Sequence, residues 1–147
     1  MTTITATVPT STRGTAALGA AVAIVSATLT TLFAHDWREA ISMSALIVVA
    51  SALVFGYVVP RALRKESAGG TALGLAIPAA LLAAPAFWSG MPLVLGVAAV
   101  LVGNAGRRAP SGSGRCIVAL VLGALASLFY LSIYVMEAVA GNTGFLL

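Results

Sequence analysis

Long uncharged apolar runs dominate this chain and constrain its fold more than any other feature. No residue from Thr15 to Ala34 carries a charge, and a second run extends from Ala40 to Val59, just before Pro60. Each run holds 20 residues, which as a helix match a hydrocarbon core about 30 Å thick. The sequence therefore predicts membrane-spanning helices, the second of which stops at Pro60.

The composition supports a membrane environment. Hydrophobic residues make up 60% of the 147-residue chain and charged residues 8%, whereas soluble domains carry about 25% charged residues. A soluble fold of this size would expose enough apolar surface to aggregate. We therefore expect an all-α polytopic membrane protein.

The later apolar sequence indicates three further spans. Residues 71–106 are uncharged, too long for one span, and interrupted by Trp88-Ser89-Gly90-Met91-Pro92. Pro92 suits the first turn of a helix, because its missing N–H is not needed there. We predict a bundle of five short transmembrane helices, at about 15–34, 40–59, 71–88, 92–106 and 116–140.

Two alternatives to this assignment stay open. Residues 71–106 can form a single re-entrant unit, but its non-helical backbone would then need cover from another helix, so five spans is the preferred prediction. The first run can also be a cleaved signal peptide. Its leading segment, however, carries only Arg13, and Leu32-Phe33-Ala34 is a poor cleavage site.

The basic residues predict the orientation of the chain, because short loops rich in Lys and Arg stay cytoplasmic. We expect a disordered cytoplasmic tail over residues 1–14 and a short extracytoplasmic tail over residues 141–147. In the five-span topology only Arg38 falls on the extracytoplasmic side. The cytoplasmic set is Arg13, Arg61, Arg64, Lys65, Arg107, Arg108 and Arg115.

The same residues indicate the partners. The net charge is +4, but the cations lie in short loops between spans, which favours anionic lipid headgroups and argues against nucleic acid. Seven Arg against one Lys, with much Ala, Gly and Val, suggests a high-GC bacterial genome and hence a bacterial plasma membrane.

Ligand counting excludes most metal and cofactor chemistry. Cys116 is the single cysteine and His35 the single histidine, so one chain cannot hold structural zinc, an iron–sulfur cluster or a bis-histidine haem. No nucleophile stands in a motif with a base. We therefore predict no cofactor, no metal and no enzymatic activity.

The turn after the first span carries a helix-start signal. Asp36 precedes Glu39 by three residues, the spacing of a capping box, and Trp37 suits an interfacial aromatic. His35 beside Asp36 could exchange protons at the outer face, but a capped turn explains both residues. We predict that Asp36 caps the second helix.

Small residues recur four apart in nearly every span. Gly70 and Gly74 form a GxxxG motif, and Ala52 and Gly56 form a similar pair. In lipid, such residues let helix backbones approach closely. They indicate packing within the bundle, which we favour, or a dimerisation face.

Glu137 is the one acidic residue within an apolar span. An intramembrane carboxylate suggests proton or cation coupling. Counting about 20 residues from Cys116, however, places Glu137 just past the hydrocarbon core. We expect it at the outer rim, where it would be hydrated.

Three further residues are candidates for a transport path or for packing. Pro78 and Pro85 fall in the third predicted span, where each removes a helical N–H and frees a carbonyl that could line a path. A simple kink is the preferred interpretation. Asn104 is expected to end the fourth span.

Residues 90–128 resemble a known type of membrane segment. A Gly-rich helix runs into Gly106-Arg107-Arg108, and Gly114-Arg115 opens a second Gly- and Ala-rich helix. This pattern is similar to a helical-hairpin membrane module of unknown function from actinobacterial proteins. The resemblance implies a membrane-embedded hairpin and no activity.

The sequence favours an accessory or structural membrane protein that acts through helix packing with itself or with a partner protein. The alternative is a small transporter or channel for ions or small solutes. It would have to be an oligomer, because five short helices are too few to enclose a wide path.

Overall fold

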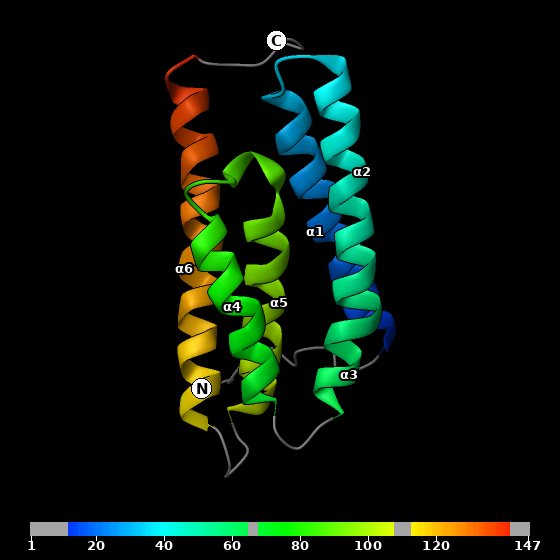
Figure 1. Ribbon diagram of the computed structural model, residues 1–147, viewed down its shortest axis with the longest axis vertical. Helices are drawn as coiled ribbons and strands as arrows, with labels where there is room; N and C mark the ends of the chain where they lie inside the picture. Colours follow the sequence, from blue (N-terminus) through cyan, green and yellow to red (C-terminus); the bar gives the residue numbers. More distant parts are fainter. Residues whose placement is uncertain (1–11, 65–67, 108–112, 142–147) are drawn as a thin grey trace, which may run out of the picture.

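The computed structural model describes residues 12–64, 68–107 and 113–141, and every regular element in these ranges is a helix. These elements form five helical rods, which run side by side along one long axis (Figure 1). The predicted all-α fold is therefore confirmed. Its elements are α1 (Thr12–Leu32), α2 (Trp37–Leu53), the π-helix η1 (Val54–Val58), α3 (Val59–Leu63), α4 (Gly69–Leu82), the 3-10 helix η2 (Phe87–Ser89), α5 (Met91–Gly106) and α6 (Ser113–Val139).

Three rods are long and apolar enough to cross a membrane. They comprise Arg13–Leu32, Trp37–Leu63 and Ser113–Val139. The other two rods, α4 and α5, have only 14 and 16 residues, which corresponds to about 21 and 24 Å. The bundle thus combines three long helices with a shorter helical hairpin.

The predicted tails lie almost entirely outside the described residues. The structure describes neither residues 1–11 nor residues 142–147, and α1 begins at Thr12 within the predicted first tail. Lys65 and Arg108 also lie outside the described ranges.

The helix ends that carry basic residues gather at one end of the bundle, drawn as the lower end in Figure 1. There α1, α4 and α6 begin, and α3 and α5 end. Arg38 lies at the opposite end, in the first turn of α2. The described basic residues at the lower end are Arg13, Arg61, Arg64, Arg107 and Arg115.

The second predicted span does not stop at Pro60, and the structure corrects that expectation. α2 continues through η1 into α3, which contains Pro60. Proline removes a backbone donor and crowds the carbonyl one turn earlier. In the wider π turn Val59 donates its N–H to the Val54 carbonyl, and this turn accommodates the proline in a continuous helix.

The turn between α4 and α5 lies inside the bundle, below the outer ends of α1 and α2 (Figure 1). Gly90 has a φ of +68°, and a Cβ atom there would lie 2.6 Å from Ile47 Cδ1 and 3.3 Å from Ser26 Cβ. Ser26 is six residues before the end of α1, and Ile47 is ten residues after the start of α2. The turn therefore lies about 9–15 Å below those ends. We call residues 69–106 the recessed hairpin.

The recessed hairpin corresponds to the two short spans predicted at 71–88 and 92–106, but its first helix is shorter. α4 ends at Leu82, so the prediction that Pro85 lies inside a helix is wrong. Pro85 cannot supply a helical N–H and disfavours the helical conformation at Ala84. The turn lies beside α1, α2 and α6, and the five spans and the re-entrant alternative both stay predictions.

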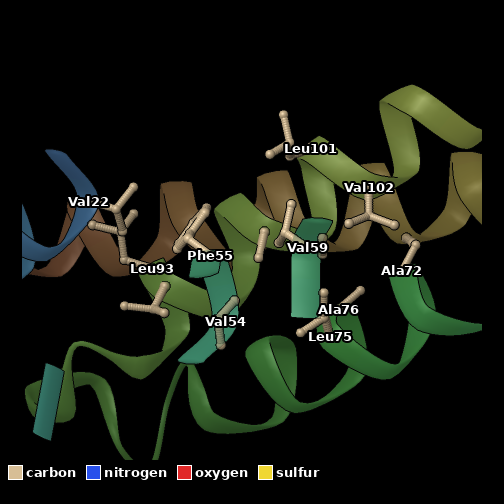
Figure 2. Close-up of a cluster of buried hydrophobic side chains, with 14 of the residues drawn as sticks. Val22, Val54, Phe55, Val59, Ala72, Leu75, Ala76, Leu93, Leu101 and Val102 are labelled. Carbon is tan, nitrogen blue, oxygen red and sulfur yellow. The ribbon is translucent and has the colours of Figure 1, made fainter. Parts of the chain in front are cut away.

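The centre of the bundle is α5, which contacts every other α-helix. Figure 2 shows the apolar cluster around it, in which Val22 of α1 and Phe55 of η1 join Leu93 and Val102 of α5. Val102 is completely buried. Around this centre α1 packs on α2, while α4 and α6 pack on each other and on α5.

Candidate functional site

Two pairs of hydroxyl side chains meet beside the turn of the recessed hairpin. Ser26 and Thr30 lie one turn apart on α1, and Tyr130 and Tyr134 lie one turn apart on α6, so each pair shares a helix face. The Tyr130 side chain lies near those of Ser26, Thr30 and Tyr134. We call these four residues the hydroxyl cluster.

The hydroxyl cluster is closed to solvent and incompletely hydrogen-bonded. Ser26 and Tyr130 are completely buried, Thr30 is 4% exposed and Tyr134 is 5% exposed. Among the described residues, Ser26 Oγ, Thr30 Oγ1 and the Tyr130 hydroxyl have no hydrogen-bond partner of normal geometry. Three polar oxygens therefore converge in an apolar bundle with unused hydrogen-bonding capacity.

Aromatic side chains surround the hydroxyl cluster on its outer side. The Tyr134 ring lies 4.9 Å from the Tyr130 ring and 5.1 Å from that of Phe33, measured between centroids. Phe87 of η2 lies 6.3 Å from the Tyr134 ring. The end of α1, the turn of the recessed hairpin and α6 thus meet around Tyr134.

Sequence reasoning missed most of this cluster. No motif in the sequence singles out Ser26, Thr30, Tyr130 or Tyr134. The available signal was that each of two helices carries a pair of hydroxyl residues four positions apart. Nothing in the sequence shows that these two faces oppose each other.

Glu137 lies two residues before the end of α6, and its side chain is half-buried. It makes no hydrogen bond or ion pair with another described residue. It follows Tyr134, the last member of the hydroxyl cluster, by three residues, but no hydrogen bond joins it to the cluster. The structure therefore does not join Glu137 to a polar site on another described helix.

The remaining predicted residues are also dispersed. Pro78 lies inside α4, Pro85 lies in the turn that follows, and Asn104 lies in the last turn of α5. Asn104 does not end α5, which continues to Gly106. None of the three belongs to the hydroxyl cluster.

The small residues divide into two groups. A Cβ atom on Gly19, Gly96, Gly103 or Gly123 would lie within 2.8 Å of an atom of a neighbouring helix, so these glycines allow close packing within the bundle. Gly70 and Gly74, by contrast, have no described atom within 4 Å of such a Cβ. The GxxxG motif therefore faces outward.

The outer turn has the predicted cap. Asp36 Oδ1 accepts a hydrogen bond from the Glu39 N–H at 2.8 Å, and Glu39 Oε2 accepts one from the His35 N–H at 3.0 Å. His35 Nδ1 lies 3.6 Å from Glu39 Oε2. The Asp36 cap is confirmed, and the side chain of His35 pairs with Glu39 rather than with Asp36.

No protein-family model, curated protein or solved structure matches the chain. The resemblance of residues 90–128 to the actinobacterial module therefore stays a prediction. Within the described ranges, no three His, Cys, Asp or Glu side chains come together in a group able to hold a metal ion.

Proposed function

We propose that the chain is a structural or accessory protein of a bacterial plasma membrane and that it acts by packing against a second copy of itself through α4. The outward-facing Gly70–Gly74 motif carries this proposal. Gly19, Gly96, Gly103 and Gly123 are used inside the bundle, whereas Gly70 and Gly74 leave their backbone open to an approaching helix and stand in a GxxxG spacing.

The exposed face of α4 continues beyond the motif. Ile77 is 48% exposed and Leu81 is 70% exposed, and both follow Gly74 along the same side of the helix. We call Gly70, Gly74, Ile77 and Leu81 the α4 face. Such a face suits a second copy, because two copies related by a two-fold axis along the membrane normal present the same residues to each other.

In this proposal the end of the bundle with the basic residues faces the cytoplasm and lies against anionic lipid headgroups. The support is the excess of arginine at that end, since short basic loops stay on the cytoplasmic side. The turn at Asp36 and the end of α6 would then face the outside.

Fluorescence energy transfer between labelled copies in liposomes tests the proposal. Gly74→Leu places a bulky side chain on the α4 face without meeting any described atom of its own chain. We expect it to weaken association by roughly tenfold, equivalent to about 1.4 kcal/mol.

The matched control is Gly56→Leu, because Gly56 is equally open but lies on η1. It should leave the energy transfer unchanged. Unchanged transfer for Gly74→Leu, or loss for Gly56→Leu instead, would contradict self-association through α4.

The second candidate function is an oligomeric transporter for ions or small solutes. The observation that favours it is the recessed hairpin, because short, interrupted helices in membrane proteins are tolerated where they line a polar path. If Glu137 couples such transport to protons, Glu137→Gln would abolish proton-driven uptake by proteoliposomes. If the chain is an accessory protein, neither the native chain nor the Glu137→Gln variant would show uptake.

A further inference from the structure

Three side-chain oxygens of the hydroxyl cluster are more than nine-tenths buried and lack a partner among the described residues, as given above for Ser26, Thr30 and Tyr130. A buried hydroxyl without a hydrogen bond costs free energy, because it has given up its bonds to water. Three such groups in one place are therefore unfavourable unless a further molecule bonds to them.

A hydroxyl on a helix has an easy way to avoid this cost, and other serines of this chain use it. Ser127 donates to the Gly123 carbonyl at 2.8 Å and Ser132 to the Phe129 carbonyl at 2.8 Å, each on its own helix. Ser26 and Thr30 make no such bond. Both residues instead lie near Tyr130 of α6, with their hydroxyls unpaired.

The chemistry of the hydroxyl cluster selects a neutral ligand. Its four members carry no formal charge. A desolvated ion would need a countercharge within the site. Hydroxyl groups both donate and accept hydrogen bonds, so they match a small molecule that does the same.

We infer that the hydroxyl cluster is a binding site for buried water between α1, α6 and the turn of the recessed hairpin. A buried water usually makes two to four hydrogen bonds, and the four hydroxyls supply that number. The rings of Phe33 and Phe87 lie 5.1 and 6.3 Å from the Tyr134 ring, so aromatic side chains border the site. Water bound there fixes the recessed hairpin against α1 and α6.

This inference does not depend on the proposed function. The site lies between α1 and α6, whereas self-association is proposed through the outward face of α4. A substitution in the hydroxyl cluster leaves the α4 face unchanged, and the reverse also holds. Each proposal can therefore be contradicted without affecting the other.

Radiolytic footprinting of the full chain in nanodiscs, with 18O-labelled water as the probe, tests the inference. Hydroxyl radicals formed from a bound water oxidise the side chain beside it, even when that side chain is buried. We expect Tyr130 to incorporate 18O. The control is Phe55, which is 2% exposed and lies within the apolar cluster. Labelling of Tyr130 no greater than that of Phe55, after normalisation to the unfolded chain, overturns the inference.

The stability of Tyr130→Phe gives an independent readout. If water bonds to the Tyr130 hydroxyl, its removal leaves that water and its neighbours unsatisfied, and the unfolding equilibrium shifts roughly fivefold toward the unfolded state. A Tyr130→Phe variant that is as stable as the native chain, or more stable, overturns the inference. Ser132→Ala, on the exposed side of α6, is the control for loss of a hydroxyl.

Discussion

Gly96 of α5 and Gly123 of α6 bring two helix backbones into direct contact. A Cβ atom on Gly96 would lie 2.7 Å from the Gly123 carbonyl oxygen, and one on Gly123 would lie 2.6 Å from the Gly96 carbonyl oxygen. Real side chains do not tolerate such distances. The contact between α5 and α6 therefore requires glycine at both positions.

Gly123→Ala should destabilise the fold by roughly 1–3 kcal/mol, because the added methyl group forces the two backbones apart. Unfolding in mixed micelles measures the change. The matched control is Gly74→Ala, where a methyl group meets no described atom and should stabilise α4 by about 0.5–1 kcal/mol. Equal effects at both positions would show that α5 and α6 do not pack through these glycines.

The helical class and the long rods were predictable, because hydrophobic runs and turn signals are local in the sequence. α1 needs only an uncharged run of sufficient length. The Asp36 cap likewise needs only a carboxylate that accepts a hydrogen bond from the backbone N–H three residues later. Both features depend on neighbours in the chain and not on the rest of the fold.

The recessed hairpin and the hydroxyl cluster could not be predicted in the same way. An uncharged run such as 71–106 is compatible with two short spans and with a re-entrant unit, and hydrophobicity does not distinguish them. The depth of the turn follows from the contacts of Gly90 with Ile47 and Ser26. These contacts join residues far apart in the sequence.

Gly90 should tolerate no side chain, for two separable reasons. Its φ of +68° disfavours other residues, and an added Cβ would meet Ile47. Gly141 has a φ of +74° but open space around it, so Gly141→Ala measures the backbone cost alone. In thermal unfolding, Gly90→Ala should have a clearly lower midpoint temperature than Gly141→Ala. Similar stabilities for the two variants would mean that the turn does not pack against α2.

Loss of the cap at the start of α2 should be measurable. Asp36→Ala removes the 2.8 Å hydrogen bond from the Glu39 N–H and should cost about 1 kcal/mol of stability. Asp36→Ser keeps an oxygen acceptor and should retain most of it. An alanine variant as stable as the serine variant would show that the cap contributes nothing in the membrane.

Thiol labelling with a membrane-impermeant reagent should establish the orientation, in a Cys116→Ser background. We expect His35→Cys, whose native side chain is 93% exposed, to react in intact spheroplasts. Gly114→Cys, at the basic end, should react only after the cells are opened. The reverse pattern would invert the proposed orientation.

The depth of the recessed turn is tested most directly by a spin label attached to a Trp88→Cys variant in liposomes. The readout is the rate at which the label collides with oxygen and with a polar nickel complex. Trp88 and Trp37 are both exposed, at 45% and 64%, but only Trp37 lies at the outer end of the bundle. Leu128, 63% exposed in the middle of α6, provides a reference for the hydrocarbon core. A label at Trp88 should resemble one at Leu128, with frequent oxygen collisions and few nickel collisions. A label at Trp88 as accessible to nickel as one at Trp37 would contradict the recessed hairpin.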